Sequence, residues 1–266
     1  MIELDRYHKA EEVSKGLYRI TENDFVNLYL VTGSEKALLI DLGCGAGDLL
    51  AAVRKLTDKP LIVAATHRHP DHIGAAGQFG SYWADPDDLR SIYDSFFGPK
   101  ASRAMCERAG MDYNPDSDKP CTVLPISDDT VFDLGDRKFV TEKIPGHTAG
   151  SRIFIDHDNK VIVSGDACNP YMFLQRPGCL NVEDWLKKAP VLLRYLKQGY
   201  RSWYGHGDGV QSAGQVEKII RYGEKILHLY REGKCSEAFG MYPEDTLPRV
   251  FYKTDCITSG TSVPEY

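Results

Sequence analysis

Long apolar runs are absent from this 266-residue sequence. No stretch approaches the roughly 18 consecutive apolar residues that a membrane-spanning helix needs. The first twenty residues, MIELDRYHKAEEVSKGLYRI, carry charges throughout and lack an apolar core of signal-peptide length. We therefore expect neither a membrane partner nor a secretion signal, and a cytoplasmic location.

Paired cysteines and basic runs are missing as well. The seven cysteines are odd in number and form no C-x-x-C pair, which argues against a disulfide scaffold and against a zinc finger. Lys and Arg number 32 against 38 Asp and Glu, a net charge of -6, and no block of basic residues stands out. Such a chain has no electrostatic footprint for nucleic acid, so a small-molecule partner is expected. Nothing in these patterns indicates an oligomeric state.

The sequence does contain the apolar content of a globular core, with 42% hydrophobic and 11% aromatic residues. Runs rich in Leu, Ile, Val and Tyr predict strands at 16–21, 26–33, 36–43 and 60–66, within 131–165, and at 201–209. Apolar residues at helical spacing predict helices at 47–57 and 212–234. This order predicts a β-rich fold of the α/β (α+β) class. Because no fixed-period repeat or low-complexity linker interrupts it, we expect a single domain over residues 1–266.

The most informative stretch is THRHPDH, residues 66–72, which holds three of the eight histidines and an aspartate. Pro70 favours extended backbone at His69, and Asp71 suits the start of a helix. On extended backbone, the side chains of His67 and His69 project to the same side, and Asp71 and His72 in the first helical turn face that point. Four potential metal ligands thus converge, although a solvated polar loop at a strand end would have the same composition.

Imidazole and carboxylate groups are ligands that Zn²⁺ and neighbouring metals accept, and Zn²⁺ takes about four of them. Further residues of these types stand directly after predicted strands and beside glycine, which lets the backbone approach a metal closely. They are His147 in IPGHTAGS, Asp166 in VSGDACN and His206 in WYGHGDG. The other histidines, His8, His157 and His228, lie in a charged N-terminal stretch, a predicted turn and a predicted helix, and we interpret them as ordinary non-ligands.

Taken in order, these residues resemble the pattern of the metallo-β-lactamase superfamily, which is Asp, then H-x-H-x-D-H, then His, Asp and His at strand ends. The matching residues are Asp41, His67, His69, Asp71, His72, His147, Asp166 and His206. They cover positions 41–206 of the chain. The resemblance implies a four-layer αββα sandwich with metals held between the loops of its two sheets.

The resemblance also implies an assignment of the ligands. One divalent metal would take His67, His69 and His147, and the second would take Asp71, His72 and His206. Asp166 would bridge both, as in glyoxalase II-like members. Asp41 would lie behind the ligands and fix one of them or its loop, although an aspartate before glycine can also be a plain turn former. Zn²⁺ is the expected metal, with Mn²⁺ or Fe²⁺ as alternatives.

Such a centre predicts a metal-dependent hydrolase. A bridging hydroxide is a nucleophile at neutral pH, since the pKa of metal-bound water falls from about 15.7 to about 7. Asp71 is the candidate catalytic residue, which would orient the water or accept its proton. Within the family, Asp166 argues against a true β-lactamase and favours hydrolases of small-molecule esters, thioesters, lactones or phosphodiesters. His69 argues against flavodiiron proteins.

Two alternatives stay open for the function. A mononuclear-iron sulfur dioxygenase would use only His67, His69 and His147. A metal-binding protein without turnover would use the ligands and no catalytic residue. The metal content separates the dioxygenase from the hydrolase.

Residues 84–120 and 168–200 fit the β-rich pattern poorly, because both are helix-like and dense in Pro, Asp and aromatic residues. We interpret them as helical insertions. Each follows a stretch that bears potential ligands, so both are expected to border the metal cleft. The candidate wall residues are Tyr93, Phe96, Phe97, Lys100, Arg103, Tyr171, Phe173 and Arg176. The last thirty residues, with three prolines, are expected to form an extended surface tail.

Tyr171 is the candidate substrate-binding residue. In the family's lactonases, a tyrosine at a similar place after the bridging aspartate donates its phenol to the oxyanion, and the resemblance implies the same role here. Pro170 should stiffen the turn that aims the side chain. A core aromatic without contact to substrate is the alternative.

Overall fold

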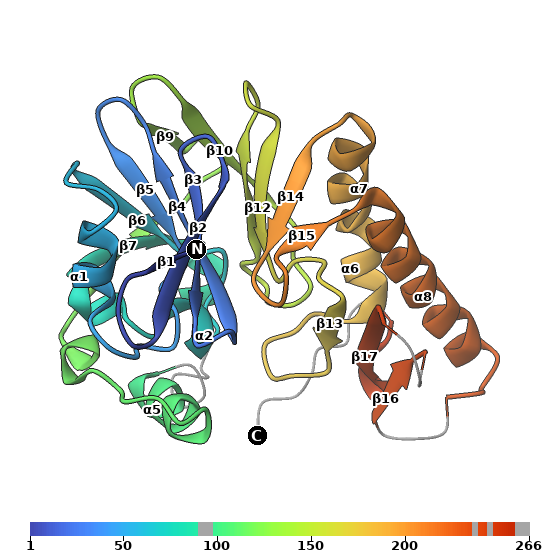
Figure 1. The fold of residues 1–266 in the computed structure, drawn as a ribbon. Coiled ribbons are helices and arrows are strands. Elements are labelled where there is room, and N and C mark those ends of the chain that lie inside the picture. Colours follow the sequence, from blue (N-terminus) through green and yellow to red (C-terminus); the bar gives the residue numbers. More distant parts are fainter. Residues whose placement is uncertain (90–97, 236–238, 244–246, 259–266) are drawn as a thin grey trace.

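Two large β-sheets pack face to face in the computed structural model, which describes residues 1–89, 98–235, 239–243 and 247–258 (Figure 1). Helix α1 covers the outer face of one sheet, and helices α6, α7 and α8 cover the outer face of the other (Figure 1). The predicted αββα sandwich is therefore confirmed. The aromatic residues Tyr93, Phe96 and Phe97 lie outside the described residues.

The first sheet contains, in spatial order, β1 (Ile2–Glu3), β2 (His8–Ser14), β3 (Leu17–Glu22), β4 (Val26–Thr32), β5 (Ala37–Ile40), β6 (Leu61–Ala64), β7 (Ser81–Ala84) and β8 (Thr122–Pro125). The second contains, in spatial order, β15 (Val210–Gln211), β14 (Arg201–Tyr204), β12 (Val161–Gly165), β11 (Arg152–Asp156), β10 (Lys138–Lys143) and β9 (Val131–Asp133). Neighbouring strands from β1 to β5 pair antiparallel, and neighbouring strands from β5 to β8 pair parallel.

The helices are α1 (Leu49–Arg54), α2 (Pro70–Ile73), α3 (Pro86–Leu89), α5 (Pro99–Arg108), α6 (Val182–Lys188), α7 (Pro190–Lys197) and α8 (Ala213–Arg231). The described residues also form the 3-10 turns η1 (Ala76–Gln78), η2 (Pro115–Asp118) and η3 (Thr254–Cys256). In the described parts of the chain, no helix has both the length and the apolar content needed to cross a bilayer.

The central strands read as continuous apolar runs because both of their faces are buried. In β4, Leu28 and Leu30 pack toward α1, whereas Tyr29 and Val31 pack between the two sheets. In β11, Phe154 packs between the sheets and its neighbours pack against the outer helices. Because alternate side chains point to opposite faces, the two sheets form three apolar layers, one between them and one on the outer face of each.

The second outer layer is built from α6, α7 and α8. Val216, Ile219, Ile220 and Ile226 of α8 are buried at the predicted helical spacing. Gly223 faces Trp185 of α6, where a Cβ atom would lie 2.7 Å from the indole ring, so glycine permits the close approach of the two helices. Within the segment 168–200, which we expected to border the cleft, α6 and α7 do not line it, because their apolar faces cover the second sheet.

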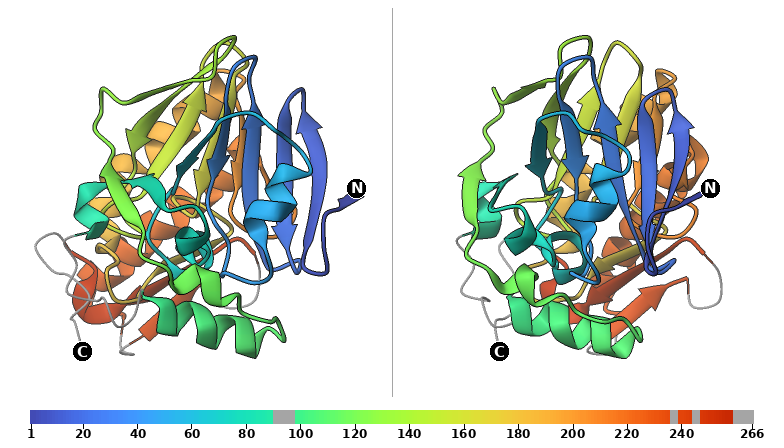
Figure 2. Two further views of the ribbon diagram at one scale, coloured as in Figure 1. Left: turned by 90° about the vertical axis from the view of Figure 1, so that its left-hand side faces the viewer. Right: turned by 60° about the vertical axis from the view of Figure 1, so that its left-hand side comes forward.

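The expectation of an extended C-terminal tail is wrong for the described residues 239–243 and 247–258. A third sheet has the spatial order β13 (Tyr171–Leu174), β17 (Arg249–Lys253) and β16 (Phe239–Tyr242). Tyr171 pairs with Arg249 in the parallel β13–β17 ladder. Val250 and Ile257 are fully buried in the same apolar cluster as the outer helices. The third sheet and α5 lie at one end of the two large sheets (Figures 1 and 2).

The N-terminal strands bury a charged cluster that the sequence did not predict. His8 begins β2 and is 0% exposed, and its Nδ1 lies 2.9 Å from the Asp5 carboxylate. Its Nε2 lies 3.4 Å from Glu22, which accepts hydrogen bonds from the backbone N–H groups of Cys44 (2.6 Å) and Ala46 (3.2 Å). The cluster therefore anchors the loop that follows β5.

Replacing His8 by Asn is expected to flatten the dependence of stability on pH. Burial lowers the pKa of His8, but hydrogen bonds to Asp5 and Glu22 outweigh burial and raise that pKa to about 9. The contribution of His8 is complete below its unfolded pKa of about 6.5 and is lost as the pH rises through the folded value. It is on the order of 3 kcal/mol, because the folded pKa lies about 2.5 above the unfolded one and one pKa unit corresponds to about 1.4 kcal/mol.

Urea unfolding between about pH 6 and about pH 10 measures this effect as the difference between parent and variant. His228→Asn is the matched control, because His228 is an exposed histidine on α8. It should keep the parental pH dependence. The interpretation fails if His8→Asn keeps it as well.

Candidate metal centre

Seven histidine and aspartate side chains gather at one edge of the two large sheets. His67, His69, Asp71 and His72 follow β6 and enter α2, His147 follows β10, Asp166 follows β12 and His206 follows β14. Strands β12 and β14 pair in parallel, and β10 runs in the same direction because the intervening β11 is antiparallel to both β10 and β12. Strands that run the same way end at the same edge, so residues far apart in the sequence meet there.

The ligand atoms fall into groups of three that lie within 4.8 Å of one another. The groups are His67, His69 and His147; His67, His72 and Asp166; and Asp71, His72 and His206. The first and third coincide with the two sets implied by the sequence. Asp166 lies between them, with its Oδ2 3.5 Å from His147 Nε2 and 3.2 Å from His206 Nε2.

Asp41 lies directly behind this cluster. Its carboxylate accepts hydrogen bonds from the Thr66 backbone N–H (2.7 Å) and hydroxyl (2.9 Å), and its Oδ2 lies 2.9 Å from His72 Nδ1. The Thr66 oxygen is in turn 3.0 Å from His67 Nδ1. Asp41 has a φ of 69°, a strained conformation for a residue other than glycine. One buried carboxylate therefore orients two histidine rings, His72 directly and His67 through Thr66.

Two backbone carbonyls orient two other rings. His147 Nδ1 lies 3.1 Å from the carbonyl oxygen of Phe173, and His206 Nδ1 lies 2.8 Å from that of Phe25. Because a carbonyl only accepts, each Nδ1 carries a proton, and each Nε2 is the ring nitrogen turned toward the cluster. Backbone acceptors leave no residue-type signal, so no sequence pattern could have pointed to them.

Burial and charge divide the histidines into two kinds. Burial lowers the pKa of His67, His69 and His147, and neighbouring imidazoles lower the first two further. Burial also lowers the pKa of His206, but Asp166 and Asp71 outweigh it and raise that pKa to about 9. His67, His69 and His147 are thus neutral imidazoles. The negative charge of Asp71 and Asp166 is concentrated around His206.

The donor set fits divalent metal ions. Among the described residues, the buried side-chain atoms without a hydrogen-bond partner include His72 Nε2, His147 Nε2 and Asp166 Oδ1, besides others outside the cluster such as Trp203 Nε1. Buried polar atoms are normally paired, and all three belong to the clustered ligand groups. Neutral imidazoles with a free lone pair and carboxylates are the ligands that Zn²⁺ and related ions take. Gly205 permits this packing, because a Cβ atom there would lie 2.5 Å from Asp166 Oδ1.

A cleft of about 600 Å³ opens onto the cluster. Its lining includes His69, Asp71, His147, Asp166 and His206 from the cluster. The remaining wall contains Asp24, Phe25, Pro70, Ala101, Met105, Arg108, Asn169, Tyr171, Phe173, Arg176 and Gly207. Phe25 also meets the His206 ring edge-on at a centroid distance of 5.7 Å.

Both predicted border segments reach this cleft in part. Helix α5 contributes Ala101, Met105 and Arg108, and residues 169–176 contribute four side chains. Lys100 and Arg103 are absent from the lining, and Arg103 instead forms an ion pair with Asp118. The wall residues on α5 were missed because helical periodicity alone does not say which face is turned toward the cleft.

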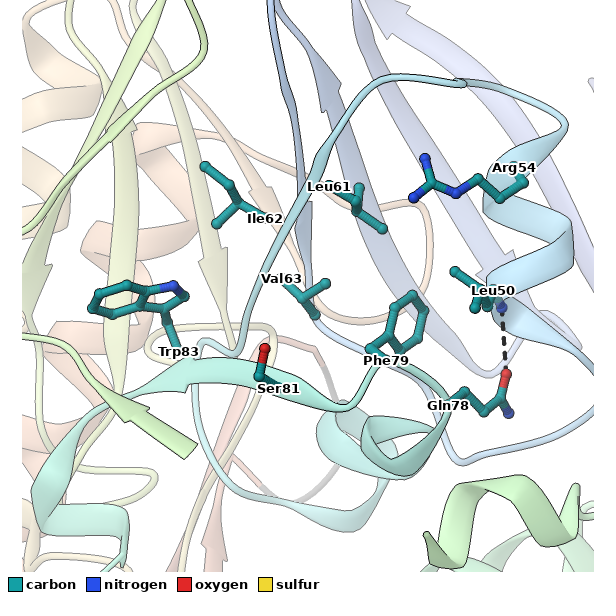
Figure 3. A pocket seen from close by; sticks show the side chains of 9 residues that line it. All are labelled: Leu50, Arg54, Leu61, Ile62, Val63, Gln78, Phe79, Ser81 and Trp83. Carbon is teal, nitrogen blue, oxygen red and sulfur yellow. Dashed lines mark hydrogen bonds between the residues drawn. The ribbon is translucent and has the colours of Figure 1, made fainter. Parts of the chain in front are cut away.

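A smaller pocket of about 310 Å³ lies beside α1 and the strands β6 and β7 of the first sheet (Figure 3). It is lined by Leu50, Arg54, Leu61, Ile62, Val63, Gln78, Phe79, Ser81 and Trp83. This lining contains no histidine, cysteine or carboxylate, so it offers no ligand set. The chemistry is therefore expected at the first cleft.

Comparison with known proteins finds relatives whose sequences align with up to about three quarters of the chain. The human acyl-coenzyme A thioesterase MBLAC2 is 28% identical over 222 residues, which cover 73% of this chain and 78% of the relative. The corresponding protein of Gallus gallus is 25% identical over 213 residues, covering 70% of this chain and 75% of the relative. The hydroxyacylglutathione hydrolase GloC of Haemophilus influenzae is 29% identical over 146 residues, covering 53% of this chain and 65% of the relative.

Solved structures share the fold. The metallo-beta-lactamase family protein TTHA1429 of Thermus thermophilus has a TM-score of 0.62 at 17% identity, covering 91% of this chain and 99% of that one. TTHA1623 in a di-iron-bound form has a TM-score of 0.51 at 25% identity, and the match covers 71% of this chain and 90% of that one. The family model described as "Metallo-beta-lactamase superfamily" matches residues 21–203. The chain therefore belongs to the metallo-beta-lactamase superfamily, as one of its hydrolases.

Proposed function

We propose that this hydrolase cleaves thioesters, with acyl-coenzyme A thioesters as the favoured substrates, at a centre of two divalent metal ions. Two ligand groups that Asp166 connects carry the proposal, because they supply both halves of a dinuclear site. The thioesterase relatives support the substrate class, since the match covers 75–78% of their length.

The three ligand groups support one assignment of the residues that would hold the metals. His67, His69 and His147 would hold the first, Asp71, His72 and His206 the second, and Asp166 would reach both. The di-iron form of the relative TTHA1623 supports two positions, and the donor set suits Zn²⁺, Mn²⁺ or Fe²⁺. When bound, such ions lower the pKa of a coordinated water to about 7 and polarise a carbonyl group.

The chain itself supplies the positioning and proton-handling groups. Asp71 lines the cleft, and its Oδ2 lies 3.5 Å from His206 Nε2. We assign it to orient the attacking water and to accept its proton. Tyr171 lies in the wall of the same cleft and would donate its phenol to the oxyanion that forms at the thioester carbon.

The wall of the cleft has both apolar and cationic side chains. These match a thioester with an apolar acyl chain and an anionic carrier. Phe25, Met105 and Phe173 provide apolar surface. Arg108 and Arg176 are exposed cations in the lining, and no ion pair to either is formed within the described ranges of the chain. Arginine binds phosphate groups with paired hydrogen bonds, so these two residues are the candidates for contact with the carrier.

A substrate panel tests the proposal. Zinc- and manganese-loaded protein should be assayed with an acyl-coenzyme A thioester, a lactone, a phosphodiester and a β-lactam. We expect kcat/KM for the thioester to reach about 10⁴ M⁻¹ s⁻¹ or more, the ordinary range of an enzyme on its own substrate, and to exceed the others. Protein treated with a chelator is the control. A preference for any other class would contradict the substrate assignment.

A further inference from the structure

Asp88 lies outside the ligand groups but is bonded to two of their loops. It stands in α3 and is 5% exposed. Its Oδ2 accepts hydrogen bonds from the backbone N–H of Arg68 (3.0 Å) and the hydroxyl of Thr148 (3.0 Å), and its Oδ1 accepts one from the N–H of Gly150 (2.7 Å). Its backbone carbonyl accepts a further bond from the Arg68 guanidinium (2.9 Å).

The residues that Asp88 binds are the immediate neighbours of ligands. Arg68 stands between His67 and His69, and Thr148 follows His147. These three histidines form the first ligand group. A single carboxylate on a third element is thus bonded to both loops from which that group is built.

The packing around Asp88 is closely fitted. A Cβ atom on Gly150 would lie 2.5 Å from Cγ of Asp88, so the loop can approach the carboxylate only because residue 150 is glycine. Burial raises the pKa of Asp88 to about 6, with hydrogen bonds from Gly150 and Thr148 acting against it.

We propose that Asp88 is a positioning residue that fixes the spacing of the His67–His69 and His147 loops, and thereby the affinity of the first metal position. The inference rests on the proposed metal centre. The carboxylate accepts three bonds, whereas an Asn side chain has one acceptor oxygen and an NH₂ group that would face a donor. Outer partners of metal ligands typically contribute about 10–100-fold to metal affinity.

Asp88→Asn tests the inference, with Asp85→Asn as the matched control. Asp85 lies in the same turn and is 4% exposed, but its carboxylate binds the side chains of Arg152 (2.6 Å) and Lys143 (2.9 Å) instead of the ligand loops. Zinc affinity is measured by competition with a chelator of known affinity. We expect Asp88→Asn to weaken the binding of one of the two zinc ions about tenfold or more, and Asp85→Asn to stay within about twofold of the parent.

Two further measurements separate positioning from folding. Thermal unfolding in excess chelator reports the stability of each variant, and the cobalt(II) absorption spectrum reports the ligand geometry. Asp88→Asn should change the spectrum and Asp85→Asn should not. If Asp88→Asn does not fold, Thr148→Val removes one of the three bonds at nearly unchanged volume and should weaken zinc binding in the same direction.

The outcomes distinguish this inference from the proposed function. A parent protein that binds no metal overturns the metal centre and this inference with it. A parent that binds two metals, with Asp88→Asn or Thr148→Val within about twofold of its affinity, overturns only the role of Asp88. Equal losses in Asp88→Asn and Asp85→Asn also overturn it, because they would reflect the stability of the turn.

Discussion

Replacement of Asp166 by Ala is expected to lower kcat/KM for the thioester by about 10³-fold or more, the upper end of what one preorganised electrostatic group contributes. Asp166 is the carboxylate whose Oδ2 lies near histidines of both ligand groups. Its loss removes the shared charge and leaves His147 and His206 without a common partner. Removal of a charged ligand from a preformed site weakens metal affinity more than packing, so the fold should remain.

Elemental analysis of protein purified without chelator checks the metal part of this prediction. The parent should contain two metals per chain and Asp166→Ala one or fewer, with circular dichroism unchanged. Asp208→Ala, which alters an exposed carboxylate after β14, should keep both metals. Unchanged metal content and turnover in Asp166→Ala would remove Asp166 from the centre. A single tightly bound iron in the parent would favour the sulfur dioxygenase.

Replacement of Tyr171 by Phe is expected to lower kcat about 10²-fold, the typical cost of one oxyanion donor. Tyr171 is 44% exposed and lines the cleft, so it is not the core aromatic that the sequence left as an alternative. The Asn169 side chain accepts a hydrogen bond from the backbone N–H of Tyr171 (2.8 Å), which fixes the start of β13. Phe preserves the packing and removes only the hydroxyl, so stability should not change.

Steady-state kinetics with the identified thioester measures this effect, and thermal unfolding measures stability. Tyr200→Phe makes the same chemical change where the hydroxyl binds His157 (2.8 Å), away from the cleft lining. It should leave kcat unchanged. If kcat of Tyr171→Phe stays within about twofold of the parent, a margin too small for a lost oxyanion donor, the tyrosine only shapes the wall.

The main sheets and the ligand cluster were predictable because their signals are local. Apolar runs such as those of β4 and β5 mark strands buried on both faces, and the ligands follow strand ends directly. The spacing in THRHPDH places four potential ligands of two types, His and Asp, on one side of the backbone within one short segment. The later ligands lie far apart in the sequence, and the resemblance to the superfamily assigned them to the same centre.

The remaining features depend on contacts between distant segments. Parallel pairing of β13 with β17 joins residues of separate regions, and neither strand has an alternation that would reveal its partner. The positions of Asp88 and His8 are of the same kind: each is ordinary in its own segment and acquires its partners only when loops meet. The apolar residues of α6 match a cleft wall and an outer layer equally well in the sequence, and only the fold places them against the second sheet.

The pairing of β13 with β17 separates two properties of the protein into different stretches of chain. The strand that carries Tyr171 and Phe173 is held in place by Arg249–Lys253, far from every metal ligand in the sequence. Side-chain substitutions in β17 that keep the β13 backbone in place, and with it the Phe173 carbonyl beside His147 Nδ1, can therefore reshape the cleft wall without moving the ligand loops. We expect descendants of such a chain to diverge in selectivity through the C-terminal strands while they keep the cluster between Asp41 and His206.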